Sequence, residues 1–415
     1  MKNLLKQAAI CLLFTLLLSA CGGGNAYPEG VPSNYYPLLD RALEGVERRG
    51  ELIDLLGQLP PEERDEMAYL MAWMPQADLD TMSLDLLREN VAWACRAREE
   101  FVWCRELPEE IFLNEVLPYY VVDEVRDEWR GSLYALVKPV VEGATSLQEA
   151  AEAVNRAITD LTGVSYNTLR EKTNQSPRES MRQGMASCTG LSILLVDALR
   201  AVGVPARFVG TASWHDNRGN HSWTEVWFEG KWWVTEYVFP GTFGDAWFMA
   251  DAGKAQTDSR NYAVYATAFG TSGDWFPMVW ALEEEVVSPD WSKAPQQIAA
   301  VNVTESYRLA SASATDERLA AGSHVWLTLE MWRDRAHASH SGDRVAANVD
   351  LFTAEGVQVG GGRTSDVLQD MNDCLRILVA KGSAYEVRYT DGADRSLKIP
   401  VWVGESDQIL KLYWL

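Results

Sequence analysis

A cysteine, a histidine and a glutamate follow one another along the chain in an order that suits thiol chemistry. Cys188 begins a largely apolar segment, and His221 and Glu236 come downstream of it. The N-terminus of a helix exposes amide N–H groups and the positive end of the helix dipole, so a cysteine placed there is biased towards its reactive thiolate. A lone cysteine on a helix is more often an inert core residue, and the prediction therefore depends on the two partners. Together the three residue types can supply a nucleophile, a base and an acid that orients the base.

The spacing of apolar residues predicts the helix that must carry Cys188. Leucine and alanine recur at three- and four-residue steps from Leu191 to Leu199, and Gly203 and Pro205 end the run. The polar residues before Leu191, Cys188 among them, then form the first turn of the helix. A short strand is predicted directly afterwards, over residues 206–210.

A hairpin is predicted to bring the other two residues together. Residues 222–228 have the composition of a strand, and Glu229-Gly230 predicts a tight turn into a second strand over residues 231–236. His221 begins the first strand and Glu236 ends the second, so antiparallel pairing places them side by side at one end of the hairpin. A helix packed on this sheet could present the thiol to the histidine across a cleft.

At this point the chain resembles the transglutaminase-like cysteine enzymes, whose core also includes peptide N-glycanases and bacterial proteases. The resemblance implies an α+β fold with a papain-like transglutaminase core. The acid is commonly aspartate in the family and is a glutamate here, whose longer side chain can still accept a hydrogen bond from an imidazole N–H. The blocks that carry the resemblance, in family order, are Gly184 to Cys188, Arg200 to Arg207, His221 to Val226, and Glu236.

The resemblance also implies a covalent mechanism. Cys188 would attack an amide or ester carbonyl, with His221 as base and then acid, and Glu236 would hold the imidazole in one tautomer. The oxyanion would lie near the backbone N–H of Cys188 at the helix start. The candidates for a second oxyanion donor are Trp214, Gln183 and Tyr166.

Two other residues compete for these roles. His215 is a second possible base, although its polar loop is typical of a solvated surface histidine, and Asp245 could replace Glu236 as the orienting acid. His337 and His340 have the spacing of metal ligands on a helix but lie in a segment typical of a polar loop. The sequence contains no Cys-x-x-Cys pair, phosphate-binding loop or dinucleotide fingerprint. We therefore expect no cofactor and no metal.

The N-terminus predicts export and a lipid anchor. Two lysines precede the apolar run 8–18, which is too short to span a membrane and ends in small residues before Cys21. Residues 1–20 resemble a bacterial lipoprotein signal peptide, and the resemblance implies that Cys21 is acylated and becomes the mature N-terminus. The alternative is an ordinary cleaved secretory signal. Residues 21–34 would form a flexible tether, and we expect the protein in the bacterial cell envelope, at the outer membrane if the cell is Gram-negative.

Composition fits an exported globular protein. The 415 residues suffice for two or three domains, and a hydrophobic content of 47% with 17 tryptophans can fill their cores. The formal net charge of −22 argues against nucleic acid as a partner. The expected partners are a protein, peptide or peptidoglycan-derived substrate, and the membrane through Cys21.

The hydrophobic pattern divides the chain into three parts. A helical region is predicted over residues 35–138, a transglutaminase-like core over 139–290 and a β-sandwich accessory domain over 297–415. Cys95 and Cys104 could form a disulfide only if the helix breaks between them, because nine residues of unbroken helix would hold them too far apart.

These observations predict an envelope-anchored thiol enzyme. It would act on amide bonds of proteins, peptides or peptidoglycan fragments through a Cys188–His221–Glu236 triad and a thioester, by hydrolysis or by acyl transfer. The alternative is a non-catalytic module that holds a peptide or glycan in a tryptophan-rich cleft. Retention of all three triad residues favours the enzyme, because binding alone does not require them.

Overall fold

The structure is a computed structural model, and it describes residues 27–238, 243–270, 272–282, 289–338, 341–369 and 374–414. The chain packs into two compact units that divide between Ala92 and Trp93, within the region predicted to be one helical part. The predicted signal peptide and Cys21 lie outside the described residues, so the lipid anchor stays a prediction. In the part of the chain that the structure describes, no helix is both long and apolar enough to cross a membrane.

The first unit is helical, as the sequence pattern predicts for this region. Pro60 and Pro61 separate two of its helices, because proline lacks the N–H that a continuous helix needs. Leu39, Leu56 and Met67 are fully buried in its core. Its helices are α2 (Tyr36–Ala42), α3 (Arg49–Gln58), α4 (Arg64–Trp73), α5 (Gln76–Thr81) and the beginning of α6 (Leu84–Glu100).

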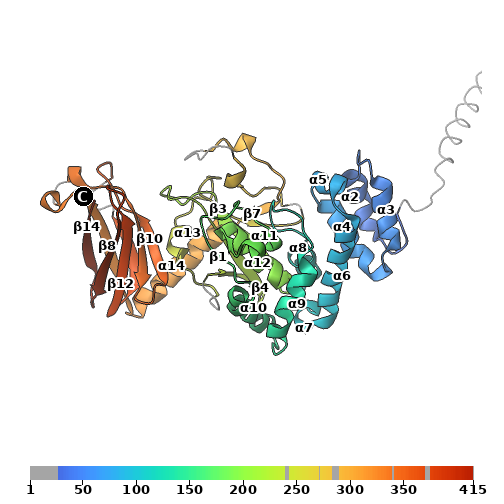
Figure 1. Cartoon of the computed structure of the whole chain (residues 1–415), viewed down its shortest axis with the longest axis horizontal. Coiled ribbons are helices and arrows are strands. Elements are labelled where there is room, and N and C mark those ends of the chain that lie inside the picture. Colours follow the sequence, from blue (N-terminus) through green and yellow to red (C-terminus); the bar gives the residue numbers. More distant parts are fainter. Residues whose placement is uncertain are drawn as a thin grey trace, which may run out of the picture. The chain divides into compact units, whose positions relative to one another are not determined.

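The second unit opens with helices that pack around a central one, α12 (Cys188–Ala201). From Leu191 to Ala201 every residue of α12 is buried, and the helix contacts α9, α10 and α11 (Figure 1). The surrounding helices are α7 (Val102–Arg105), α8 (Glu109–Glu115), α9 (Trp129–Val141), α10 (Leu147–Thr162) and α11 (Pro177–Gln183).

The two cysteines near the start of this unit are not bridged. Helix α6 ends at Glu100 and α7 begins at Val102, so the helix is interrupted between Cys95 and Cys104. Even so, the described cysteines form no disulfide. Cys104 is buried against Gly203, where the Cβ of any other residue would lie 2.6 Å from the Cys104 sulfur. Glycine at position 203, whose φ is +73°, is therefore required both by the turn that follows α12 and by the close approach of the thiol.

A five-stranded antiparallel sheet lies against α12, with strand order β5-β4-β3-β6-β7. Helix α12 packs on β3 and β4, so the predicted helix and hairpin form one layered core. Strands β1 and β2 form a short parallel pair, and β2 ends just before Ser187 and Cys188. The strands are β1 (Ser165–Tyr166), β2 (Met185–Ala186), β3 (Ala206–Thr211), β4 (His221–Phe228), β5 (Lys231–Thr235), β6 (Val264–Thr267) and β7 (Ala300–Asn302).

The C-terminal strands form the two sheets of a sandwich, with orders β10-β9-β12-β13 and β11-β8-β14. Buried and partly exposed residues alternate along most of β8 and β12, as expected for strands with one face in a core. Leu327, Leu351, Val387 and Val403 are among the least exposed residues of that core. The strands are β8 (His324–Trp332), β9 (Asn348–Thr353), β10 (Gln358–Arg363), β11 (Leu375–Ala380), β12 (Ser383–Thr390), β13 (Ser396–Val403) and β14 (Gln408–Tyr413).

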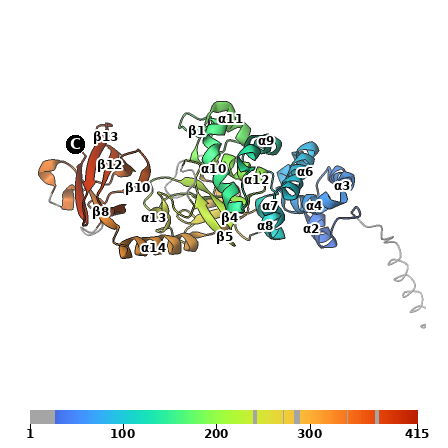
Figure 2. The same ribbon diagram turned by 90° about the horizontal axis from the view of Figure 1, so that it is seen from below.

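The structure corrects the predicted start of this domain at residue 297. Strand β7 pairs with β6 in the core sheet, and helix α14 (Thr304–Ala320) follows it before the sandwich begins at His324 (Figure 2). The sequence pattern misses α14 because Thr304 and Tyr307 are its only residues that are buried, which leaves no apolar periodicity to detect. The boundary between core and sandwich therefore lies after α14.

Candidate active site

Cys188 is the first residue of α12, and its position is fixed by the residue before it. The Ser187 side chain accepts a hydrogen bond from the Gly190 N–H at 3.1 Å and donates one to the Thr173 carbonyl at 2.6 Å. This is an N-cap, which satisfies one of the free amides at the helix start. The backbone N–H groups of Thr189 and Ser222 help to lower the pKa of the Cys188 thiol. The thiol is therefore half-buried at the positive end of a well-anchored helix.

His221 and Glu236 meet at the end of the β4–β5 hairpin, as predicted. Nε2 of His221 lies 2.6 Å from Oε1 of Glu236, and their side chains are 14% and 7% exposed. This contact leaves Nδ1 as the ring nitrogen available to the Cys188 thiol, and each of the two groups shifts the pKa of the other. Asn155 on α10 holds the acid in place by donating to the Glu236 carbonyl oxygen at 2.9 Å. The structure thus brings together all three residues that the sequence predicts.

The competing residues lie elsewhere. Asp245 pairs with Arg318 on α14, and its side chain is 57% exposed. Nε2 of His215 lies 3.6 Å from Oδ1 of Asp251, on the short helix α13 (Met249–Ala252). Asp245 therefore does not replace Glu236 beside His221, and His215 pairs with an acid outside the Cys188–His221–Glu236 cluster.

The three-residue cluster stabilises charged forms of the thiol and the imidazole. Burial lowers the pKa of His221, but hydrogen bonds to Cys188 and Glu236 and their charges outweigh it and raise the pKa to about 10. Burial raises the pKa of the Cys188 thiol, yet the hydrogen bond and charge of His221, with the two backbone N–H groups, bring the pKa below its ordinary value. A thiolate beside an imidazolium is the favoured state of this pair.

Four aromatic rings enclose the imidazole of His221. The distances from its ring centroid are 5.1 Å to Phe248, 5.2 Å to Trp247, 5.8 Å to Trp223 and 6.0 Å to Trp214. These rings limit the access of water and fix the plane of the imidazole. Trp247 also lines a cavity of about 70 Å³ bounded by α13, α14 and the sandwich. The sequence pattern does not mark Phe248 or Trp247 as site residues, and only their closeness to Asp245 could have drawn attention to them.

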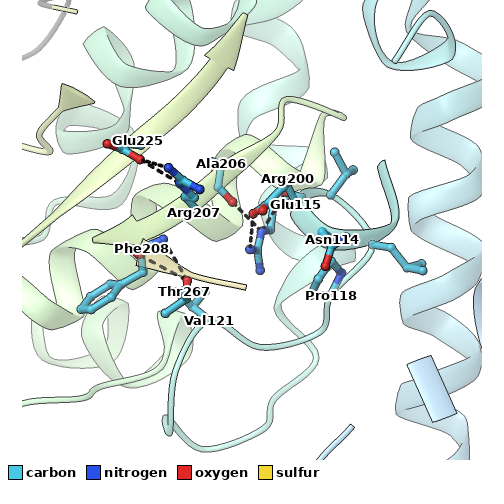
Figure 3. Close-up of polar contacts among 12 residues, drawn as sticks. Asn114, Glu115, Pro118, Val121, Arg200, Ala206, Arg207, Phe208, Glu225 and Thr267 are labelled. Carbon is cyan, nitrogen blue, oxygen red and sulfur yellow. Dashed lines mark hydrogen bonds and ion pairs between the residues drawn. The ribbon is translucent and has the colours of Figure 1, made fainter. Parts of the chain in front are cut away.

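The alternation of β4 explains the spacing of its polar and aromatic residues. His221, Trp223 and Glu225 share one face, because side chains two apart in a strand point the same way. The Trp223 N–H donates to the Tyr307 hydroxyl at 2.6 Å, and that hydroxyl donates to Oε1 of Glu225 at 2.7 Å. Arg207 on β3 donates to the other oxygen of Glu225 at 2.8 Å (Figure 3). This chain of hydrogen bonds fixes the tryptophan that stacks on the imidazole.

Arg200 anchors the opposite end of α12. Its guanidinium donates to the carbonyl oxygens of Glu115 and Ala206, both at 3.0 Å (Figure 3). Burial raises the pKa of the Glu115 carboxyl to about 7, although Arg207 and Arg200 lower it. At the helical rise of about 1.5 Å per residue, Arg200 lies about 18 Å along the helix from Cys188. Its contacts therefore support the helix and do not line the thiol end.

The candidates for the second oxyanion donor differ in the state of their polar atoms. Tyr166 is 55% exposed. Trp214 is buried and stacks on Trp223 with ring centroids 6.1 Å apart. Gln183 accepts a hydrogen bond from the Glu171 N–H at 3.1 Å, and its buried Nε2 has no protein partner among the described residues. Gln183 therefore offers a buried N–H donor, and Trp214 and Tyr166 stay candidates beside it.

Residues 134–237 match the family model of the transglutaminase-like superfamily. This stretch of the chain is a transglutaminase-like domain. It contains Cys188 and His221 and ends one residue after Glu236, so the acid within the matched region is Glu236 and not Asp245. In the described residues of the domain and beyond, no group of three or more histidine, cysteine or acidic side chains could hold a metal ion.

Solved structures and curated proteins add little to this assignment. A Cytophaga hutchinsonii protein, provisionally described as a cysteine protease, is similar at 16% identity and a TM-score of 0.27, covering 34% of this chain and 46% of its own. The Bacillus anthracis TIE protein is similar at 9% identity and a TM-score of 0.17, covering 50% of this chain and 30% of its own. The chain thus spans less than half the length of either. A search of curated proteins finds no match.

Proposed function

We propose that the protein is a thiol enzyme that acts on amide bonds of proteins, peptides or peptidoglycan fragments. The observation that supports this best is the position of the His221 imidazole, which lies 2.6 Å from the Glu236 carboxylate and lowers the pKa of the Cys188 thiol. The transglutaminase-like domain that contains all three residues supports the same reaction class.

In the proposed reaction the Cys188 thiolate forms a bond to the amide carbonyl carbon. The oxyanion that develops faces the backbone N–H at the start of α12, and Gln183, Trp214 and Tyr166 are the candidates for the second donor. The C–N bond then breaks, and the proton carried by His221 passes to the leaving amine, which gives a thioester and a neutral imidazole. Water or a second amine attacks the thioester, His221 takes its proton, and Cys188 leaves as the thiolate. Hydrolysis and acyl transfer differ only in this last nucleophile.

A non-catalytic peptide- or glycan-binding module remains the alternative. Its support is the set of aromatic rings around His221, since tryptophan side chains provide large contact areas for ligands. A binding site, however, has no need for a buried carboxylate held against an imidazole nitrogen. The enzyme is therefore the better-supported proposal.

A substrate screen that follows two products tests the proposal. The purified protein is incubated with peptide and peptidoglycan-fragment libraries, and both peptide cleavage and incorporation of a labelled primary amine are measured. We expect at least one product, its loss in Cys188→Ala, and its retention in Cys104→Ala, which removes a buried thiol far from any predicted chemistry. Tight binding of a fragment by the wild type and by Cys188→Ala alike, with no product in either, would favour the binding module.

We also propose that the protein is attached to the bacterial envelope through lipid on Cys21. The support is the lipoprotein-type signal over residues 1–20, with small residues directly before the cysteine. Mass spectrometry of the native protein should find Cys21 as an acylated N-terminus, and Cys21→Ser should move the protein out of the membrane fraction. Cys11→Ser is the matched control, because that residue leaves with the signal. An unmodified N-terminus at another residue would exclude the anchor.

A further inference from the structure

The loop of residues 212–220 delivers His221 to the site, and it is closed by its own hydrogen bonds. The Trp214 N–H donates to the Gly219 carbonyl at 2.8 Å, and the Asn217 N–H donates to the Trp214 carbonyl at 2.9 Å. In this loop Arg218 points inward, and its side chain is only 7% exposed. A buried guanidinium needs a partner for its charge.

Arg218 faces three carboxylates from three different segments. It lies 2.7 Å from Asp216 of its own loop and 2.6 Å from Asp251 on α13, both largely buried. The third is Asp350 on β9 of the sandwich: a Cβ at Gly361 would lie 2.7 Å from its Oδ1 and 3.5 Å from Nη1 of Arg218. Burial raises the pKa of this carboxyl, and the charge of Arg218 acts against that rise. His215 also approaches Asp251, at 3.6 Å. One cation thus neutralises acids that would otherwise be buried together.

The pair of Arg218 and Asp251 joins two walls of the ring enclosure around His221. Trp214 belongs to the loop of Arg218, whereas Trp247 and Phe248 come directly before α13, which carries Asp251. All three rings lie within 5.1 to 6.0 Å of the imidazole, measured between centroids. Loss of the Arg218–Asp251 pair would therefore loosen both walls at once.

The sandwich supports the same loop from its other side. The backbone N–H of Arg363, the last residue of β10, donates to the Asp216 carboxylate at 3.0 Å. Gly361 on the same strand leaves room for Asp350, because a Cβ at this position would lie 2.7 Å from the Asp350 carboxylate. The C-terminal domain is thus in contact with the loop that ends at His221.

We propose that Arg218 is a positioning residue for His221, and that through it the β-sandwich supports the active site. This inference rests on the proposed function, in which Cys188 is the nucleophile and His221 carries the proton. Arg218 acts through the loop and α13 and touches neither the thiol nor the substrate. When it is lost, the imidazole is less firmly held against the thiol, and the thiolate loses part of its stabilisation.

The test is the pH profile of alkylation of Cys188 by iodoacetamide, quantified by mass spectrometry on the full-length protein. In wild type we expect labelling to continue well below the pH at which an ordinary thiol stops reacting. Arg218→Met should move the midpoint of the profile to higher pH, and for a movement of one pH unit the thiolate population on the acid side falls about tenfold. Arg218→Lys keeps the positive charge but lacks the planar guanidinium that contacts both Asp216 and Asp251. Its profile should lie between those of the wild type and Arg218→Met.

Two further variants separate positioning from simple stability. Arg156→Met removes a surface arginine of α10 that pairs with Glu152 at 3.2 Å, and it should leave the profile unchanged. Asp216→Asn keeps the size of the side chain and should shift the profile in the same direction as Arg218→Met, but by less. It can still be measured if Arg218→Met fails to fold. Wild-type profiles in both Arg218→Lys and Asp216→Asn would overturn the positioning role, whatever their melting temperatures. A wild-type Cys188 that titrates as an ordinary thiol would instead count against the proposed function.

Discussion

At the scale of single residues, Cys188 and His221 hold each other in charged forms. Neither pKa shift has a simple cause, because burial alone would push both groups towards neutrality. The partner's charge and the hydrogen bonds reverse that tendency, with Glu236 acting on the far nitrogen of the ring. A cysteine without these neighbours behaves differently: burial raises the pKa of the Cys104 thiol to about 12.

The first residue-scale prediction concerns pH. The Cys188 pKa lies below its ordinary value and the His221 pKa near 10, so the thiolate–imidazolium pair is populated between these two values. As pH falls through the lowered thiol pKa, the nucleophile is protonated and turnover drops. As pH rises through about 10, the imidazolium loses the proton that the leaving amine needs, and turnover drops again. We expect a bell-shaped profile of kcat/KM on any substrate found by the screen.

A matched variant checks the origin of that profile. His221→Asn removes the cation and leaves burial, which raises the thiol pKa, so labelling of Cys188 at neutral pH should fall by roughly tenfold or more. The pH midpoint of Cys188 labelling is a better measure than the labelling rate at one pH, because a thiolate of lower pKa is also intrinsically less nucleophilic. Unchanged labelling in His221→Asn would show that the imidazole does not control the thiol.

At the scale of elements, local sequence signals predicted the parts that depend on neighbours in the chain. Leucine spacing indicated the helix at Cys188, and Glu229-Gly230 indicated the hairpin, where both residues adopt the positive φ, 53° and 77°, that a tight turn requires. Together they were enough to place His221 and Glu236 at one end of the hairpin.

Partners that are distant in sequence could not be predicted in this way. The amide of Asn155 reaches Glu236 across 81 residues, and Tyr307 reaches Trp223 across 84. No period or motif in one sequence records such a pairing, because it depends on how α10 and α14 pack on the sheet. These contacts still matter energetically: a buried polar group left without its partner costs about 1–3 kcal/mol. The residues that support the site were therefore harder to find than the residues that form it.

At the scale of the whole molecule, the core and the sandwich share more than the sequence pattern predicts. Strand β7 and Tyr307 both lie after residue 297, yet they belong to the core sheet and to the support of Trp223. Beyond α14, the sandwich reaches back to the loop before His221 through Arg363. The change of hydrophobic period from helical to alternating marks where the sandwich strands begin, and it does not mark where the core ends.

The last prediction compares two truncations of the chain. A protein ending at residue 323 keeps β7 and α14 and loses only the sandwich, whereas one ending at 296 also loses Tyr307. We expect the longer form to unfold cooperatively on heating, with Cys188 still reactive to iodoacetamide but with its profile shifted to higher pH, because the Asp216 loop has lost the contact from β10. The shorter form should melt at a markedly lower temperature, or not cooperatively, because the edge of the core sheet and the partner of Trp223 are gone. Equal melting temperatures and equal labelling profiles in the two forms would show that α14 belongs to the sandwich alone and that the core ends where the hydrophobic pattern changes.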